Sequence, residues 1–365
     1  MIGVAPQAWH GQRPSCRNGK FADSSEATHS RYCDIILSML AKTWPLLLLL
    51  VSGAYAQQAT NLRVQSNMVL VPTLVKDAEG HVVYGLTQDD FVIEDDGKEQ
   101  AVHLDESAES QPVSVVVVVQ TGRRAWREYS RMRGISPMLT PVLDQFRSRV
   151  ALVEFDSAVR LVEDFSDDPT AVYEDLKKLQ PGDNGAAICD AVDFSVRLLE
   201  KEPADRQRVL LLVSENRDHG SHITKVDDVV TAIGNSNTVV YALAFSPSLS
   251  QVIDTGRGSN RDEAYWDAPP DIKGTLMMAR NAMKKNVTEA IAKMTGGEYE
   301  LFTTRKGFEL RMVDFNNHLH SRYVLSFAPK EPHSGLHRIH VRLKQSLPRT
   351  SVLSRTSYWA TGPTP

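Results

Sequence analysis

The spacing of hydrophobic and polar residues is most regular in the middle of the chain. Val113 to Val119 is an almost unbroken run of valine, which is typical of a strand buried on both faces of a parallel sheet. Strand-like and helix-like patterns alternate after this run. The predicted strands are 150–155, 159–162, 209–213, 239–245 and 298–302, and the predicted helices are 138–147, 169–179, 187–200, 226–233, 287–294 and 308–319. This alternation predicts a doubly wound, Rossmann-like α/β fold with a mostly parallel sheet.

Shorter strand-like stretches lie on both sides of this region. They are 68–75, 81–84, 91–94 and 100–104 before it, and 323–328, 337–343 and 352–358 after it. Gly97, in the turn between two of them, suits the positive φ that tight hairpin turns require. Since a β unit as short as residues 61–104 is marginal alone, we expect the strands from the two ends to form one small β domain, into which the α/β domain is inserted.

The same patterns divide the chain into four parts. We predict a signal peptide with its upstream region at 1–56, an N-terminal β module at 57–110, an α/β domain at 111–312, and a C-terminal β segment at 313–365 that packs with 57–110. The polar stretch 106–111 marks the first boundary between folded parts. Residues 246–285 form an irregular insertion, longer than the usual connection in a compact domain, and such loops are usually functional or disordered.

The first 56 residues have the features of an export signal. Trp44 to Val51 is too short to span a bilayer but has the length of a signal-peptide core, and Lys42 supplies the positive flank. Ala54-Tyr55-Ala56 has the small-x-small form that a signal peptidase recognises, so we predict cleavage after Ala56 and a periplasmic or secreted protein. Met1 and Met39 both remain candidates for the start. No later stretch is apolar enough to span a membrane.

Composition and charge narrow the range of functions. With 365 residues, of which 42% are hydrophobic and 24% charged, the chain is long enough to bury a substantial core. Its net charge is −4, so the chain has no excess of positive charge that would hold a phosphate backbone. We therefore expect no nucleic-acid partner. Of the three cysteines, only Cys189 follows the predicted cleavage site, which leaves no pair for an intrachain disulfide in the exported chain.

Motifs spread over the whole predicted mature chain resemble one known family. They are VVYGLT at 82–87, DF at 90–91, EDDG at 94–97, RVALV at 149–153, DAV at 190–192, TGG at 295–297 and YVLSFAP at 323–329. Together they are similar to the acidobacterial VWFA-related domain family. The resemblance implies a von Willebrand factor A-like fold and, as an expectation for the class, binding to another macromolecule. It implies no particular ligand.

The resemblance also implies where a metal ion would be held. Domains of this fold normally carry a metal-ion-dependent adhesion site, in which a DxSxS motif, a Thr and an Asp hold Mg²⁺ and leave one position for a partner's carboxylate. On this chain the five positions fall, in order, on Gln120, Gly122, Arg124, Ala186 and Glu215. Only Glu215 keeps a carboxylate, and a guanidinium among the ligands repels a divalent cation. We therefore expect a degenerate site with no metal and no other cofactor, and Mg²⁺ is disfavoured.

Enzymatic interpretations find less support. Cys189, His219 and Asp218 would form a thiol–base–carboxylate set if their loops converge, but Cys189 lies on an apolar helix face where a buried structural cysteine is the common outcome. His219 and His222 are three apart, yet the glycine between them indicates a turn and no third metal ligand is evident. We expect Asp190 to bond neighbouring backbone. The sequence thus favours a protein that is not an enzyme.

The favoured function is a non-catalytic interaction or adhesion-type module of an exported bacterial protein, with an unidentified protein partner. The candidate surface consists of the loops 120–124, 182–186, 215–222 and 246–285. We hypothesise that Arg123 or Arg124 replaces the cation and receives an acidic group of the partner, because guanidinium matches carboxylate geometry; the alternative is two solvated arginines on a loop. Two other functions stay open: a structural component of an envelope assembly that associates through its β domain, and a metal-binding adhesion site with non-standard ligands.

Overall fold

The computed structural model describes most of the chain after residue 67. The described residues are 68–105, 111–129, 132, 135, 137–139, 148–245, 272–330, 333–345, 347 and 349–361. The predicted signal peptide with its upstream region lies outside them, as do residues 106–110, most of the predicted helix 138–147, and residues 246–271 of the predicted insertion. Residues 66–365 form one compact unit. Within the described ranges, every helix is too short or too polar to span a bilayer.

A six-stranded sheet forms the centre of the α/β part. Its strands, in spatial order, are β10 (Tyr299–Phe302), β9 (Thr238–Phe245), β8 (Gln207–Ser214), β5 (Val113–Gln120), β6 (Arg149–Phe155) and β7 (Val159–Ser166). Neighbouring strands are parallel, except that β7 runs antiparallel to β6. Every residue of β5 is buried, as its valine run predicts. The predicted doubly wound α/β fold with a mostly parallel sheet is confirmed.

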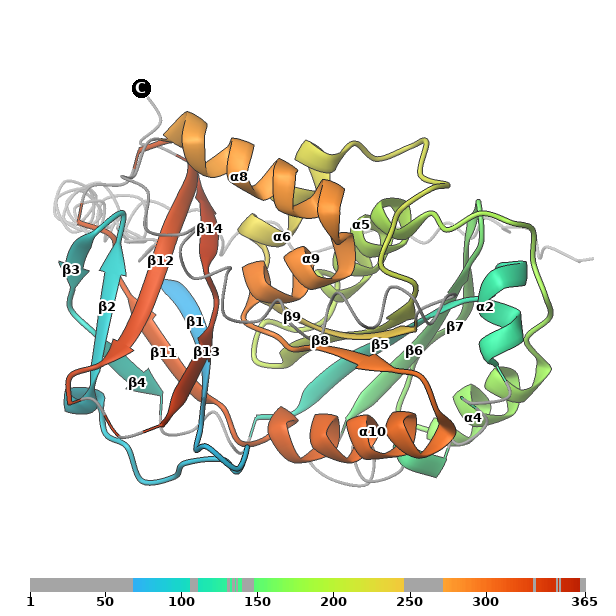
Figure 1. The fold of residues 1–365 in the computed structure, drawn as a ribbon, viewed down its shortest axis with the longest axis horizontal. Helices are drawn as coiled ribbons and strands as arrows, with labels where there is room; N and C mark the ends of the chain where they lie inside the picture. Colours follow the sequence, from blue (N-terminus) through green and yellow to red (C-terminus); the bar gives the residue numbers. More distant parts are fainter. Residues whose placement is uncertain are drawn as a thin grey trace, which may run out of the picture. The chain divides into compact units, whose positions relative to one another are not determined.

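Helices cover both faces of this sheet (Figure 1). One face carries α5 (Ile188–Leu199), α6 (Val226–Asn235), α8 (Ile272–Lys285) and α9 (Val287–Thr295), and the other carries α2 (Arg123–Glu128), α4 (Pro169–Lys178) and α10 (Arg305–Leu319). Alternate residues of β5 point into two hydrophobic cores, one on each face of the sheet. Val116 belongs to the core that contains Ile188 of α5, whereas Val117 belongs to the core that contains Phe308 of α10. The strand is therefore the innermost one of a three-layered arrangement.

Two four-stranded antiparallel sheets form the β part. One has the order β13 (Ser351–Ser354), β1 (Val69–Lys76), β11 (Tyr323–Phe327), β4 (His103–Asp105), and the other has the order β14 (Ser357–Ala360), β12 (Gly335–Leu343), β2 (Phe91–Asp95), β3 (Lys98–Gln100), with a short 3-10 helix, η1 (Gln88–Asp90), before β2. Strands from the two ends of the described chain pair in both sheets, because β1 pairs with β11 and β13, and β2 with β12. Val71, Ile93, Phe327 and Ile339 share one core. The expectation of a small β domain built from both ends is confirmed.

Several details differ from the expectations. The stretch predicted as one strand at 100–104 contributes to β3 and β4, which lie in different sheets, and alternation of side chains does not reveal such a change of sheet. The stretch 81–84 forms only an isolated bridge between Val82 and Lys76. Within the insertion predicted to be irregular, α8 forms because Ala279 and Met283 bury one face in the core. The domain boundary predicted at 312 falls inside α10, which continues because Leu319 packs in the same core.

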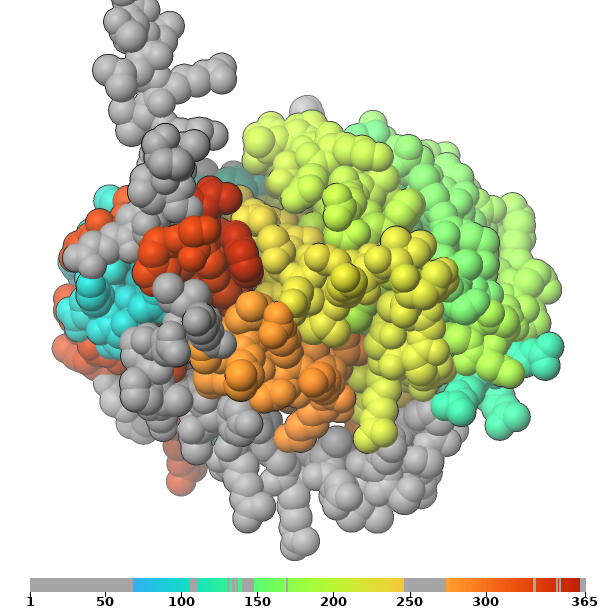
Figure 2. All heavy atoms as spheres, turned by 90° about the horizontal axis from the view of Figure 1, so that it is seen from above, coloured from blue at the N-terminus to red at the C-terminus, as the bar shows by residue number. Residues whose placement is uncertain are grey.

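Buried charged groups join the β part to the α/β part. Arg355, between β13 and β14, is 4% exposed and donates hydrogen bonds to the carbonyl oxygens of Gly234 in α6 and Leu70 in β1. Glu298, just before β10, lies 2.8 Å from Lys76 Nζ of β1 and 2.8 Å from His318 Nδ1 of α10. Figure 2 shows α6 and α8 beside the strands from the C-terminal end at the surface. These bonds fix the orientation of the β part on the sheet.

Candidate functional site

The loops at the carboxyl ends of the parallel strands are where α/β sheets usually place a ligand site. Hydrogen bonds between backbone groups hold three of the four predicted loops together. The N–H groups of Gly182, Arg123 and His219 donate to the carbonyl oxygens of Thr121 (2.8 Å), Asp183 (2.6 Å) and Ala186 (3.2 Å), respectively. The structure therefore brings the loops that follow β5, precede α5 and follow β8 to one place. Much of the fourth loop, 246–285, lies outside the described residues.

Gln120 and Glu215, which the sequence comparison assigns to the first and last expected metal-ligand positions, are hydrogen-bonded to each other. Gln120 Nε2 donates to Glu215 Oε1 (2.8 Å), and the backbone N–H of Glu215 donates to Gln120 Oε1 (2.9 Å). His219 Nε2 lies 2.7 Å from the same Glu215 Oε1. Gln120 is fully buried and Glu215 is 4% exposed. Both side chains are thus engaged by the protein itself.

Gly122, at the second metal-ligand position, has no room for a side chain. A Cβ atom on Gly122 would lie 2.5 Å from the carbonyl oxygen of Gly185, and a Cβ on Gly185 would lie 2.6 Å from Ser157 Cβ. Real Cβ contacts of this kind are essentially never seen, because atoms at such distances overlap. The loops are therefore packed backbone against backbone where a serine ligand would stand. Ala186, at the threonine position, is fully buried in the core that contains Ile188.

Two carboxylates that sequence reasoning did not single out hold these loops. Asp156 accepts hydrogen bonds from the backbone N–H of Ala158 (2.9 Å) and of Asp183 (3.2 Å), and lies 3.0 Å from Arg160 Nη2. Asp183 in turn accepts from the N–H of Gly185 (2.7 Å). Burial alone would raise the pKa of Asp156, but hydrogen bonds from Arg160 and the loop N–H groups outweigh it, so the pKa is lowered. The sequence did offer one signal for Asp156, because this acidic residue directly follows the predicted strand 150–155.

The residues of the considered thiol–base–carboxylate set do not act together. Cys189 is 3% exposed, and its backbone N–H donates to Asp218 Oδ2 (2.8 Å). Burial, with the neighbouring charge of Asp218, raises the pKa of the Cys189 thiol and so disfavours the nucleophilic thiolate. His219 contacts Glu215 instead. Cys189 is a buried structural cysteine, as the sequence indicates.

Asp190 bonds backbone, as expected from the sequence. Its carboxylate accepts hydrogen bonds from the N–H groups of His222 (3.1 Å), Ile223 (3.3 Å) and Thr224 (2.6 Å). The ring of His222 faces the carbonyl oxygen of Gly220 (3.1 Å), so His219 and His222 have different partners and do not form a pair of metal ligands. Asp190 therefore shapes the loop after β8.

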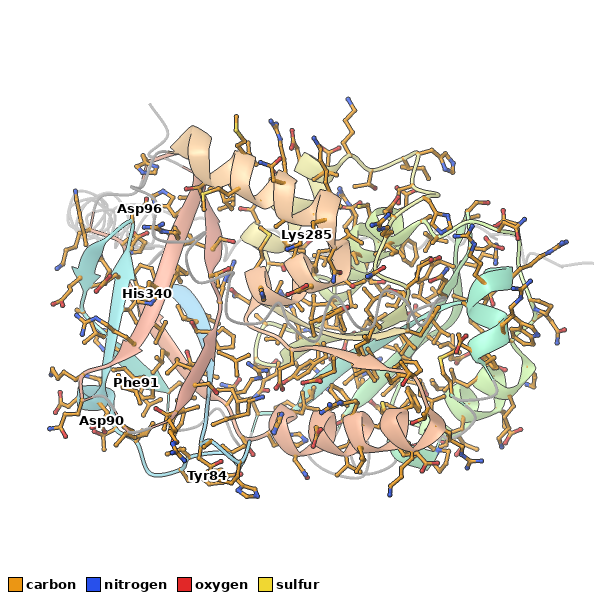
Figure 3. All side chains as sticks on the ribbon, viewed as in Figure 1. Tyr84, Asp90, Phe91, Asp96, Lys285 and His340 are labelled. Atoms are coloured by element: carbon orange, nitrogen blue, oxygen red, sulfur yellow. The ribbon has the colours of Figure 1, made fainter. Side chains whose placement is uncertain are left out.

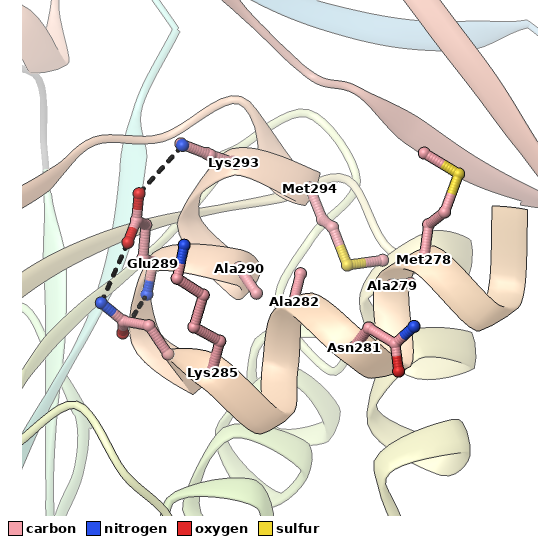
Figure 4. Close-up of a pocket in the computed structure, with 10 residues that line it drawn as sticks. Met278, Ala279, Asn281, Ala282, Lys285, Glu289, Ala290, Lys293 and Met294 are labelled. Carbon is pink, nitrogen blue, oxygen red and sulfur yellow. Dashed lines mark hydrogen bonds and ion pairs between the residues drawn. The ribbon is translucent and has the colours of Figure 1, made fainter. Parts of the chain in front are cut away.

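A pocket lies between α8 and α9 (Figure 4). Its lining includes the short or apolar side chains of Ala282, Ala290 and Met294. Glu289 and Lys293, its charged members on α9, form an ion pair of 2.9 Å. The Glu289 carboxylate is thus already paired with a lysine of the same helix.

Exposed arginines follow both members of the Gln120–Glu215 pair closely along the chain. Arg123, Arg124 and Arg127 of α2 are exposed, and so is Arg217, two residues after Glu215. We call these four residues the arginine rim. Within the part of the chain that the structure describes, their side chains make no hydrogen bond or ion pair. The predicted Arg123 and Arg124 thus reach solvent beside the degenerate ligand positions, and Arg217 is an addition that only the fold reveals.

Comparison with known proteins finds a similarity in the centre of the chain. Residues 124–217 match the family model of the von Willebrand factor type A domain. Similar solved structures include an aerotolerance-related membrane protein from Bacteroides fragilis (16% identity, TM-score 0.37, 56% of this chain and 98% of that one), proximal thread matrix protein 1 of the mussel byssus (11%, 0.41, 61% and 49%), and a von Willebrand factor type A protein from Catenulispora acidiphila (10%, 0.41, 80% and 62%). No curated protein sequence matches the chain. Residues 124–217 are thus similar to the von Willebrand factor type A domain family, and the α/β part that contains them has a von Willebrand factor A-like fold.

Proposed function

We propose that this chain is a non-catalytic module that binds a protein partner through the arginine rim, without a metal ion. The observation that carries the proposal is the Gln120–Glu215 pair. Its two hydrogen bonds engage the residues at two of the expected ligand positions, and four exposed arginines without partners among the described residues follow these two residues along the chain. The lack of space for a side chain at Gly122 supports the same conclusion.

The chemistry of the rim indicates an acidic partner. In a metal-dependent site the cation attracts a carboxylate of the partner, and a guanidinium provides the same attraction with two parallel hydrogen bonds. An exposed ion pair contributes only about 0–1 kcal/mol, so several arginines must act together to give a useful affinity. Binding through the rim should therefore weaken as salt is raised, because exposed charges are screened.

Charge reversal on the rim tests the proposal. The full chain and the variant Arg123→Glu/Arg124→Glu are immobilised and used to capture partners from extracts of the source cells, with quantification by mass spectrometry. We expect the variant to lose the captured partners, and the wild-type chain to keep them in EDTA. The matched control is Arg197→Glu/Lys201→Glu, which reverses two exposed charges at the other end of the sheet, where α5 leads into β8. Equal capture by all three chains, or loss of capture in EDTA, would contradict the proposal.

We place this module outside the cytoplasm, in the periplasm or beyond the cell. The support is the sequence of the first 56 residues, with Lys42, the apolar run from Trp44 to Val51, and Ala54-Tyr55-Ala56. N-terminal sequencing of the mature protein from an exported fraction should begin at Gln57. An intact leader on a protein that stays in the cytoplasm would overturn this placement.

A further inference from the structure

Three side chains of the β part lie close enough to share one ion. Asp96 lies in the turn between β2 and β3, His333 precedes β12, and His337 lies in β12. Asp96 Oδ2 is 3.0 Å from His337 Nδ1 and 3.3 Å from His333 Nε2. In a tetrahedral site with metal–ligand bonds of about 2.0 Å, neighbouring ligand atoms are about 3.3 Å apart. Both distances are compatible with ligand atoms that share one tetrahedral ion, and all three ligand atoms lie within 4.8 Å of one another.

The hydrogen bonds of His337 determine which nitrogen faces the cluster. Its Nε2 lies 2.8 Å from the carbonyl oxygen of His333, which can only accept, so Nε2 carries the hydrogen. The Nδ1 atom of His337 therefore faces the cluster: it lies 3.0 Å from Asp96 Oδ2 and 3.3 Å from Asp95 Oδ1. Two carboxylates on one side of Nδ1 favour a positive charge there, which either a proton on Nδ1 or a bound metal ion supplies. A carbonyl that accepts the second N–H is also the usual outer contact of a metal-bound histidine.

The surrounding side chains hold the cluster in place. His333 stacks on His337 with ring centroids 3.8 Å apart, and His337 stacks on Tyr358 of β14 at 4.7 Å. Tyr358 Oη donates to Asp95 Oδ2 (2.9 Å). The side chain of His337 is 1% exposed, whereas that of His333 is 42% exposed, so an ion has a path from solvent on the His333 side.

A proton alone accounts for only part of this arrangement. Protonation of His337 would explain its contact with Asp96. It does not involve the second imidazole, His333, whose Nε2 turns to the same carboxylate oxygen. A metal ion at this place would be bound by the facing nitrogens of both rings and by the carboxylate oxygen.

We propose that Asp96, His333 and His337 form a binding site for a divalent transition-metal ion, with Zn²⁺ as the best fit. Two imidazole nitrogens and one carboxylate oxygen suit Zn²⁺, whereas Mg²⁺ and Ca²⁺ prefer oxygen ligands alone. Three protein ligands leave one tetrahedral position for water or for a group of another molecule. The ion ties the β2–β3 turn to β12. This site is independent of the arginine rim and of the function proposed for it.

Zinc titration of the full-length chain and its variants tests the site. Binding of ZnCl₂ is measured by calorimetry, and Co²⁺ is used as a second probe because tetrahedral Co²⁺ absorbs strongly in the visible range. We expect His333→Ala and Asp96→Asn each to weaken Zn²⁺ binding about tenfold or more. Asn is chosen because Asp96 has a φ of 48°, a conformation that Asn tolerates. The control is His340→Ala, which removes an exposed histidine elsewhere on β12, near Glu94 (Figure 3), and should bind as wild type does.

The results for these variants distinguish a metal-binding site from an ion pair that only stabilises the fold. Metal-free His333→Ala should keep the wild-type circular dichroism and melting temperature, because its ring is partly exposed, and should lose only the rise in melting temperature that Zn²⁺ gives the wild type. If Asp96→Asn disturbs the fold without metal, His333→Ala decides alone. A wild-type chain that binds no Zn²⁺, or variants that bind it as tightly as the wild type, would overturn the proposal.

Discussion

Replacing Gln120 by methionine tests whether Gln120 and Glu215 form a buried, hydrogen-bonded pair. Methionine has nearly the same length but cannot form the two bonds to Glu215, at 2.8 and 2.9 Å. A buried N–H left without a partner costs about 1–3 kcal/mol, and a lost bond to a charged carboxylate costs about 1.5–3 kcal/mol. His219 keeps its contact with Glu215 Oε1, which offsets part of the loss. We therefore expect the free energy of unfolding to fall by about 3 kcal/mol.

Urea unfolding followed by circular dichroism, in the presence of EDTA, measures this change. The midpoint should fall while the slope against urea stays constant, because the variant exposes the same surface on unfolding. Arg124→Met is the control, since its side chain is exposed, and it should change stability by less than about 0.5 kcal/mol. Glu215→Met has no carboxylate that could be left unpaired. Adding Gln120→Met to this variant should therefore lower the free energy of unfolding by less than Gln120→Met does in the wild type. A loss below about 1 kcal/mol, or full additivity of the two changes, would refute the reasoning.

Two further predictions concern the buried charges that join the β part to the sheet. Burial alone would raise the pKa of Glu298, but its hydrogen bond with His318 and the nearby positive charges, Arg322 and Lys76, outweigh burial and lower the pKa to about 2. Because this lies below the ordinary value of 4.5, the stabilisation is complete above about pH 5 and is lost as pH falls toward 2. When the free energy of unfolding is measured against pH, the wild type should lose about 3 kcal/mol through protonation of Glu298, and Glu298→Gln should not show this loss. Parallel curves for the two proteins would contradict the prediction. Arg355→Leu leaves buried carbonyl oxygens without their donor and should lower the unfolding free energy by about 3 kcal/mol in the same urea assay, whereas an unchanged midpoint would show that these bonds are not made.

The fold was largely predictable because its strongest signals are local. A run of valine can be buried on both faces only in the centre of a sheet, so β5 and the alternation around it followed from the sequence. The helix α8 was missed because its buried residues, such as Ala279 and Met283, are few and lie among polar ones. The change of sheet between β3 and β4 was missed because side-chain alternation is the same in both sheets.

The sequence indicated which residues belong to the candidate site but not which contacts their side chains make. The sequence places Gln120 and Glu215 at former ligand positions, yet their mutual hydrogen bonds depend on the adjacency of β5 and β8. The close approach of Gly122 to Gly185 is likewise a property of three packed loops. Asp96 gave only a turn signal, because its nearness to His337 depends on the pairing of β2 with β12.

The most direct test of the central claim is an anomalous difference map from crystals of the full chain grown with Mn²⁺. Mn²⁺ prefers the same oxygen ligands as Mg²⁺ and occupies adhesion sites that retain them. We predict no anomalous peak within bonding distance of Gln120 and Glu215, and the direct hydrogen bonds between the two side chains intact. An octahedrally coordinated ion between them, with Gln120 turned away from Glu215, would contradict the account.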